Sequence, residues 1–309
     1  MMTGLESILG ALAPIFVLVI IGYLMGRIRF PDANFWPQAE RLTYYFLFPT
    51  LLTYKIGSAN LPSGTISHVI FSLITLLITS SILVLILGYF FEKSHAKLTS
   101  VFQGGIRFNT YVGLAAASAL FGDEGLIWGA VFMAVMIPGV NIACISCFAV
   151  LIPEKKHSLM KNLWIGVSRN PLILACLFGA LLNISGIGIP SKIAPLLELI
   201  SGMALPLGLL AVGVGLKIGE FKQASLPLWY ATIFKLIIYP VLFLMLAKWF
   251  GLSEIVTGVL LLFAVLPTAP SGYILARQLK GDAGLMANII TLQTMAAMIT
   301  MPLMMTLLF

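Results

Sequence analysis

The sequence predicts an all-α integral membrane protein with ten transmembrane helices, arranged as two inverted repeats of five helices each. Three observations support this fold class: the apolar composition, the length of the apolar segments, and an internal duplication. Of the 309 residues, 60% are hydrophobic and 9% are charged, and the mean hydropathy is +1.05. A soluble domain carries about 25% charged residues, so the composition excludes a soluble globular protein.

Short stretches rich in Gly, Pro, Ser and Asp separate the apolar segments. A helix needs about 20 apolar residues to cross the hydrocarbon core, whereas a strand of a membrane barrel needs about 10 with alternating polarity. The segment lengths therefore predict helices. The ten predicted spans are residues 7–26, 36–56, 66–91, 100–121, 125–151, 164–184, 192–217, 227–250, 255–278 and 284–308.

The basic residues predict the orientation of the chain in the lipid bilayer. The net charge is +7, but the basic residues form short clusters between apolar segments rather than one patch, which argues against a nucleic-acid partner. The loops after odd-numbered spans contain Arg27, Arg29, Lys93, Lys97, Lys155, Lys156, Lys161, Arg169, Lys217, Lys222, Arg277 and Lys280, whereas those after even-numbered spans contain little beyond Lys55, Lys192 and Lys248. The positive-inside rule then predicts a multi-pass plasma (inner) membrane protein with both termini outside the cytoplasm.

The two halves of the chain share a sequence pattern. Gly113, Ala117, Leu120, Gly122, Asp123, Gly125 and Leu126 recur 159 residues later as Gly272, Ala276, Leu279, Gly281, Asp282, Gly284 and Leu285. Further matches at similar offsets are Pro14 with Pro171, Gly22 with Gly179, Pro31 with Pro190, Pro49 with Pro206, and Lys55-Ile56-Gly57 with Lys217-Ile218-Gly219. This duplication predicts a first repeat over 1–153, a short basic cytoplasmic linker over 154–163 and a second repeat over 164–309. Because five spans is an odd number, the second repeat is inverted, which is typical of secondary transporters.

Two repeat-related spans contain features that interrupt a helix. In the ninth span, Pro267 and Pro270 each remove an amide donor and clash with the preceding turn. In the fourth span, the equivalent stretch contains the polar pair Asn109-Thr110. Two interpretations remain open. The helices either break and present free N–H and C=O groups to a substrate, or the prolines only kink the ninth span and Asn109 bonds a neighbouring helix.

Two cationic residues lie deep in predicted spans, Arg107 in the fourth and Lys235 in the eighth. A charge at the bilayer centre costs about 2.5–3.5 kcal/mol, so each needs a compensating role. Arg107 either attracts an anionic substrate or pairs with Glu198 or a backbone carbonyl, or extends toward the membrane surface. For Lys235 a structural role is favoured.

The expected core contains no acidic residue in spans 125–151, 255–278 and 284–308. Proton or sodium coupling often uses a buried carboxylate, so a cavity with positive helix ends and no carboxylate suits an anion. Neutral oxygens near the breaks could ligate sodium weakly, from Asn109, Thr110, Thr268, Ser271, Asn288 or Gln293. No metal or cofactor is predicted, and Asp123 and Asp282 are interpreted as helix N-caps.

Several motifs resemble the auxin efflux carrier family, which contains plant PIN carriers and bacterial malate/malonate permeases. They are Asn109-Thr110 with Gly113, Leu266-Pro267-Thr268-Ala269-Pro270 leading to Ala276, Pro302, Phe48-Pro49-x-Leu51-Leu52, Asn170-Pro171-Leu172-Ile173 with Gly179, and Pro206-Leu207 with Gly213. The resemblance implies a fold related to sodium/proton antiporters and bile acid symporters. Spans 1, 2, 6 and 7 would form a scaffold, and spans 3–5 and 8–10 a moving transport domain. Spans 4 and 9 would cross at Asn109, Pro267 and Pro270, transport would be elevator-like, and homodimers would form through the scaffold.

The sequence departs from the PIN pattern at two places. Phe108 precedes Asn109 where PIN carriers usually have proline, so the motif predicts unwinding of the fourth span less strongly than the PIN motif does. In place of a long regulatory loop there is a short basic stretch over 153–169. This stretch indicates a small prokaryotic-type permease.

The expected function is secondary transport of an organic anion, such as malate, malonate or an auxin-like acid. The expected substrate-binding residues are Asn109, Thr110, Thr268, Ser271 and Arg107, and the expected helix breaks involve Pro267, Pro270, Gly113 and Gly272. One alternative is a sodium-coupled symporter of the bile acid type, and another is a membrane sensor that binds an anion without moving it. An enzyme is not expected, because the sequence presents no nucleophile–base pair or metal motif.

Overall fold

The computed structural model describes residues 4–32, 34–59, 66–152, 170–216, 218 and 225–308, and within these ranges it contains helices and no strands. Six helical segments of this part are long and apolar enough to cross a membrane: Leu5–Arg27, Ile66–Phe91, His95–Leu151, Ala194–Val214, Leu226–Trp249 and Ala283–Leu308. Two shorter apolar helices are Pro171–Ile184 and Glu254–Ala264. The predicted all-α membrane protein is therefore confirmed in the described part. The predicted linker 154–163 and the basic residues Lys155, Lys156, Lys161, Arg169, Lys217 and Lys222 lie outside the described residues.

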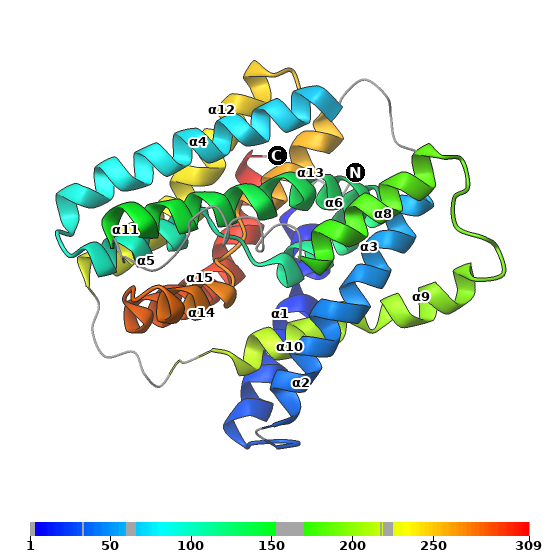
Figure 1. Ribbon diagram of the computed structural model, residues 1–309, viewed down its shortest axis with the longest axis horizontal. Coiled ribbons are helices and arrows are strands. Elements are labelled where there is room, and N and C mark those ends of the chain that lie inside the picture. Colours follow the sequence, from blue (N-terminus) through cyan, green and yellow to red (C-terminus); the bar gives the residue numbers. More distant parts are fainter. Residues whose placement is uncertain are drawn as a thin grey trace.

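Helix α1 (Leu5–Arg27) crosses α10 (Ala204–Val214) at close range (Figure 1). A Cβ atom at Gly213 would lie 2.0 Å from the carbonyl oxygen of Val19, and one at Gly22 would lie 2.1 Å from that of Leu210. Because neither distance leaves room for a side chain, the two glycines allow the helix backbones to touch. Small residues at helix crossings are typical of packing inside membranes.

A second close pair joins α3 (Phe48–Gly57) to α8 (Pro171–Ile184), at the right of Figure 1. A Cβ atom at Gly179 of α8 would lie 3.2 Å from the carbonyl oxygen of Thr53. Asn183 Nδ2 donates hydrogen bonds to the carbonyls of Ile56 and Ala59 at the end of α3. Helix α9 (Ala194–Gly202) precedes α10 and contacts α3.

Two helical segments contain a π-helical turn. The first runs through α2 (Phe35–Leu42), η1 (Thr43–Leu47) and α3, and the second through α11 (Leu226–Ile233), η3 (Phe234–Ile238) and α12 (Tyr239–Trp249). In each, the second residue after the π turn is a proline, Pro49 or Pro240. A proline ring clashes with the carbonyl four residues earlier, and the wider π turn relieves this contact.

The remaining helices form a bundle of α4 (Ile66–Phe91), α5 (His95–Ile106), α6 (Thr110–Leu151), α13 (Glu254–Ala264), α14 (Ser271–Gln278) and α15 (Ala283–Leu308). Helix α6 consists of two helical parts joined at Gly122, whose backbone has φ 59° and ψ −140°. This conformation suits glycine because it lacks a Cβ atom. Gly122 therefore marks the predicted boundary between the fourth and fifth spans.

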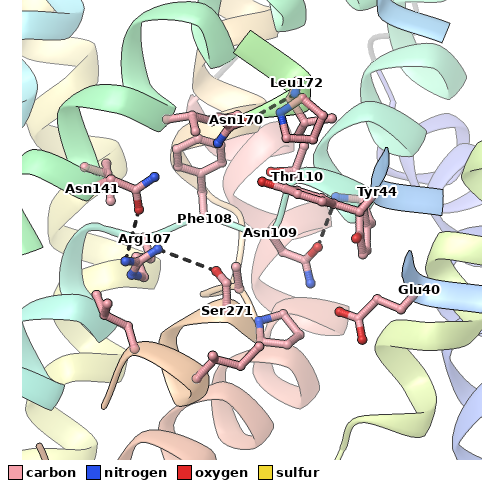
Figure 2. Close-up of a pocket in the computed structure, with 18 of the residues that line it drawn as sticks. Glu40, Tyr44, Arg107, Phe108, Asn109, Thr110, Asn141, Asn170, Leu172 and Ser271 are labelled. Atoms are coloured by element: carbon pink, nitrogen blue, oxygen red, sulfur yellow. Dashed lines mark hydrogen bonds between the residues drawn. The ribbon is translucent and has the colours of Figure 1, made fainter. Parts of the chain in front are cut away.

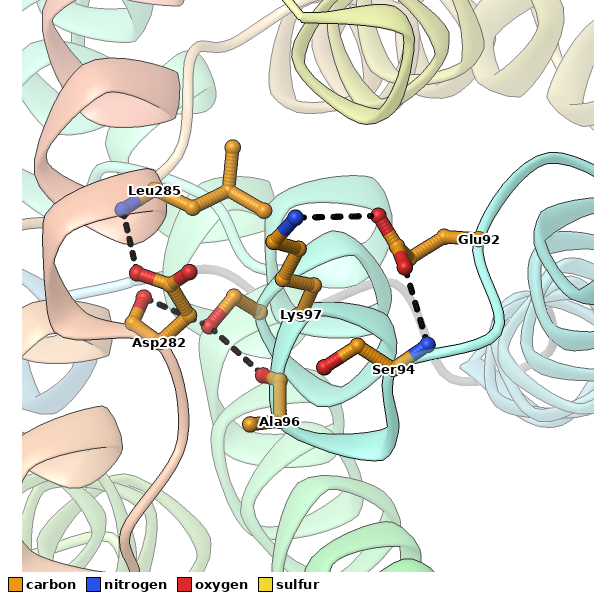
Figure 3. A network of polar contacts seen from close by, with 7 residues as sticks. Glu92, Ser94, Ala96, Lys97, Asp282 and Leu285 are labelled. Carbon is orange, nitrogen blue, oxygen red and sulfur yellow. Dashed lines mark hydrogen bonds and ion pairs between the residues drawn. The ribbon is translucent and has the colours of Figure 1, made fainter.

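A polar network holds the α14–α15 connection against α5 (Figure 3). The Asp282 amide donates to the Ala96 carbonyl (3.0 Å), and Ser100 Oγ donates to the Asp282 carbonyl (2.8 Å). Asp282 Oδ1 accepts from the Leu285 amide (2.8 Å), which confirms that this aspartate caps a helix. Its repeat equivalent, Asp123, forms an ion pair with Lys55 (2.7 Å).

Candidate functional site

Both predicted interruptions are present, and they contact each other. Helix α5 ends at Ile106 and α6 begins at Thr110, with an extended backbone at Arg107 and Asn109. Helix α13 ends at Ala264 and α14 begins at Ser271. The Asn109 amide donates a hydrogen bond to the Pro267 carbonyl (2.8 Å), so the two non-helical stretches cross at this point.

Two buried side chains satisfy the carbonyls exposed by the break after α5. Thr268 Oγ1 donates toward the carbonyls of Gly104 and Arg107, each at 3.2 Å. Gln293 Nε2 donates to the carbonyls of Gly104 (2.9 Å) and Ala231 (3.1 Å), and Gln293 Oε1 accepts from the Thr268 amide (3.0 Å). Carbonyls at a helix C-terminus need such partners. Thr268, expected to bind substrate, is therefore placed behind the crossing and bonded to backbone.

A cavity of about 580 Å³ lies beside the crossing. Helix α2, the turn η1, the start of α8, both parts of α6 and helix α14 contribute to its wall. The lining residues are Pro37, Glu40, Arg41, Tyr44, Tyr45, Arg107, Phe108, Asn109, Thr110, Tyr111, Ile137, Val140, Asn141, Asn170, Pro171, Leu172, Ala269, Pro270, Ser271, Ile274, Leu275 and Gln278. Of the predicted substrate-binding residues, Arg107, Asn109, Thr110 and Ser271 are together in this cavity (Figure 2).

Arg107 lies at the buried end of the cavity and is 7% exposed. Neutral oxygens hold its guanidinium: Nε donates to Gln103 Oε1 (3.0 Å), and the terminal nitrogens donate to Asn141 Oδ1 (3.2 Å) and Ser271 Oγ (3.5 Å). Among the described residues no carboxylate lies within ion-pair distance of it, so the suggested pairing with Glu198 is not formed. An unpaired buried charge is costly, so this arrangement favours an anion beside Arg107.

The two polar atoms of the Asn109 side chain differ in their hydrogen bonding. Its Oδ1 accepts hydrogen bonds from the amides of Tyr111 (3.1 Å) and Val112 (3.3 Å), which makes it the N-cap of α6. The side chain is 1% exposed, and its Nδ2 has no hydrogen-bond partner in the described part of the chain. Asn109 lines the cavity, and Figure 2 shows its side-chain amide between Arg107 and Glu40.

Three described helices begin at the cavity: α6 at Thr110, α8 at Pro171 and α14 at Ser271. Asn170 caps α8 by accepting from the Leu172 amide (3.0 Å), much as Asn109 caps α6. A helix N-terminus carries about half a positive charge, which favours a nearby anion by roughly 0.3–1 kcal/mol. Together with Arg107, these ends make the buried part of the cavity electropositive.

The expectation that the site lacks acidic groups is wrong, because Glu40 lines the cavity. Glu40 comes from α2 in the second predicted span, whereas the expectation rested on the spans around the breaks. Asn141 and Asn170 also line the cavity and were not predicted. Asn141, a polar residue inside the apolar span 125–151, was a sequence signal for this wall, whereas Glu40 lies in a polar stretch beside Arg41 and did not stand out. The Asn170-Pro171 pair carried a further signal, since it is typical of a helix start.

The two predicted glycines lie where the broken segments approach neighbouring helices. A Cβ atom at Gly113 would lie 2.7 Å from both Phe263 and Leu266, and one at Gly272 would lie 2.6 Å from the methyl end of Met286. Pro267 supplies the carbonyl at the crossing, and Pro270 is the N-cap residue of α14.

Lys235 does not line the cavity. It lies in η3 with no exposed surface, and its Nζ sits 3.9 Å from the centroid of the Tyr239 ring. Its Nζ has no hydrogen-bond partner among the described residues. A cation over an aromatic face is stabilised by the ring quadrupole, which is consistent with the structural role favoured from the sequence.

Comparison with known proteins adds two findings. A family model described as "Membrane transport protein" matches residues 7–305. A protein named "Uncharacterized transporter YfdV" from Escherichia coli (strain K12) is 26% identical over 291 residues, which cover 88% of each chain. Proteins of the same name from Escherichia coli O157:H7 and Shigella flexneri match with the same identity and coverage.

Proposed function

Because the chain belongs to the membrane transport protein family, the auxin efflux carrier family that its motifs resemble, we propose that it is a secondary transporter of an organic anion. The observation that carries this proposal is Arg107, a buried guanidinium without a carboxylate partner among the described residues, in a cavity where three helices begin. A substrate carboxylate would supply the missing charge. Its two oxygens match the fork geometry of a guanidinium.

The helix arrangement supports ten spans in two inverted repeats. The two interruptions lie at positions 159 residues apart in the repeat pattern. The close pairs α1–α10 and α3–α8 join span 1 to span 7 and span 2 to span 6. In the proposed repeats span 1 is equivalent to span 6, and span 2 to span 7. The pair formed by spans 1 and 7 is therefore equivalent to the pair formed by spans 6 and 2, as expected for a duplicated architecture.

The cavity position supports an elevator-type movement. Its wall combines residues of the proposed scaffold, such as Tyr44 and Asn170, with residues of the proposed transport domain, such as Arg107 and Ser271. A substrate between two such units can change sides when one unit slides past the other. The family resemblance implies that the scaffold also forms the homodimer contact.

The basic residues suggest which side the cavity faces. Its exposed lining residues include Glu40 and Arg41, which follow the loop with Arg29, and Gln278, which adjoins Arg277. These loops belong to the set that the positive-inside rule assigns to the cytoplasm. The structure would then represent an inward-facing conformation of a plasma-membrane protein with both termini outside.

The sodium-coupled alternative has less support. The carbonyls at the C-terminal end of α5 that could ligate a cation accept hydrogen bonds from Thr268 Oγ1 and Gln293 Nε2. A mono- or dicarboxylate, such as malate, malonate or an auxin-like acid, remains the proposed cargo. Replacing sodium with potassium in the assay buffer should leave the flux unchanged.

Uptake of labelled carboxylates into proteoliposomes tests the proposal. Arg107→Gln should reduce uptake by at least about tenfold, because a buried charge pair of this kind is worth about 2–5 kcal/mol. Lys248→Gln, which removes an exposed cation outside the cavity lining, is the matched control and should transport like the wild type. Wild-type uptake by Arg107→Gln would refute the proposal, and binding without flux would favour the sensor alternative.

A further inference from the structure

Glu40 is an acidic group in a cavity that otherwise favours anions. It projects from α2, and Figure 2 shows its carboxylate directed into the cavity on the wall opposite Arg107. Among the described residues it forms no ion pair. Glu40 also borders a smaller cavity of about 410 Å³ with Arg29 and Asp32, and Arg29 does not form an ion pair with it.

The cavity thus presents charges of opposite sign on facing walls, Arg107 and Glu40, and neither has an ion-pair partner in the described part of the chain. Arg107 is held by neutral oxygens, and the Asn109 Nδ2 donor between the two walls is also unbonded within the described residues. A ligand with only carboxylates would compensate Arg107 but would be repelled by Glu40. A ligand that also carries an ammonium group would compensate both.

The charges of the lining suggest the composition of such a ligand. Its charged residues are Arg41, Arg107 and Glu40, which give a net charge of +1. The complementary set is two carboxylates and one ammonium group, with a net charge of −1. We propose that the substrate is an amino dicarboxylate, with one carboxylate at Arg107, its ammonium group toward Glu40 and its second carboxylate toward Arg41. This inference rests on the proposed function, and it narrows the class of organic anion.

Three compounds with the same four-carbon dicarboxylate skeleton test this assignment. Succinate, malate and aspartate differ only in the hydrogen, hydroxyl or ammonium group at the second carbon. Binding to the purified full chain in detergent can be measured through its thermal stability, because a ligand of the native state raises the unfolding temperature. Aspartate should bind tightest and succinate weakest, with dissociation constants at least about tenfold apart.

The variant Glu40→Gln isolates the contribution of the charge. It keeps the size of the side chain but removes its negative charge. Aspartate should then bind more weakly and succinate more tightly, so that the ratio of their dissociation constants falls to about one. Glu254→Gln removes another exposed carboxylate, at the start of α13 and outside the cavity lining, and should leave the order unchanged. An unchanged ratio in Glu40→Gln would overturn the inference.

Arg107→Gln separates failure of this inference from failure of the proposed function. If succinate or malate binds as tightly as aspartate and Arg107→Gln abolishes that binding, the inference is wrong and the anion transporter stands. The same conclusion follows if only monocarboxylates bind in an Arg107-dependent way. If no carboxylate binds in an Arg107-dependent way, both proposals are wrong.

Discussion

Asn141 and Gln103 determine how Arg107 presents its charge. Both accept hydrogen bonds from the guanidinium through uncharged amide oxygens, at 3.2 Å and 3.0 Å. They fix the orientation of the side chain without neutralising it. A carboxylate in either position would form an internal ion pair and compete with an incoming acid.

Asn141→Asp tests this competition. The new carboxylate lies at hydrogen-bond distance from Arg107 and should raise the KM for uptake by at least about tenfold, as expected for a buried ion pair. Asn141→Ala removes the same hydrogen bond without adding charge, so its KM should rise less. Uptake kinetics in proteoliposomes measure both, and equal effects of Asp and Ala would show that charge at this position is irrelevant.

A substitution at Asn109 can separate an effect on protein stability from an effect on substrate binding. Asn109→Asp keeps an oxygen that can cap α6, and Asp and Asn are about equally good N-caps, so the unfolding temperature should change little. The substitution replaces the free Nδ2 donor with a negative charge at the cavity wall, so carboxylate uptake should be lost. Uptake at the wild-type level would exclude Asn109 from substrate binding.

The interruptions of two helices are the elements on which the site depends. Pro267, Pro270 and the Asn109-Thr110 pair indicated them but left a simple kink as an alternative, because loss of an amide donor and a capping side chain are local properties. The crossing itself depends on a backbone contact between Asn109 and Pro267. Such a contact between distant segments is not encoded in a local pattern, and the family resemblance supplied it.

The other site residues that the sequence analysis misplaced or missed also depend on contacts between distant segments. Thr268 lies in the predicted motif but turns toward the carbonyls after α5. Glu40 and Asn141 come from helices whose approach to the crossing depends on packing of the whole bundle. Residues at the breaks could therefore be predicted from the sequence, whereas the helices that bring Glu40 and Asn141 to the same cavity could not.

Close packing of α1 and α10 leads to a stability prediction. Gly213→Ala would place a Cβ atom 2.0 Å from the Val19 carbonyl oxygen, and the helices would have to separate. Overpacking typically costs about 1–3 kcal/mol, so thermal unfolding in detergent should occur at a clearly lower temperature. Gly202→Ala, where a Cβ atom meets nothing within 4 Å, is the control and should unfold like the wild type. Equal unfolding temperatures would mean that the crossing is not tightly packed.

At the scale of the whole molecule, alternating access requires that the cavity open to one side at a time. The Lys55–Asp123 ion pair (2.7 Å) joins α3 of the proposed scaffold to the turn between the fourth and fifth predicted spans. The loop pattern places this contact at the outer surface, away from the exposed residues Glu40 and Gln278 of the cavity. An inward-facing molecule would be closed at this end.

Sidedness can be measured with a cysteine at Ser271, which is exposed and lines the cavity. The three native cysteines are buried, so a membrane-impermeant maleimide should react mainly with Ser271→Cys. The reaction should be faster in inside-out than in right-side-out vesicles. Faster labelling in right-side-out vesicles would reverse the proposed orientation.

The most direct measurement is an experimental structure of the protein with a bound carboxylate substrate. We expect the carboxylate within hydrogen-bond distance of the Arg107 guanidinium and Asn109 Nδ2, between the first turns of α6, α8 and α14. A substrate bound away from Arg107, or a helix continuous through residues 107–109 without contact to Pro267, would contradict the proposed transport site.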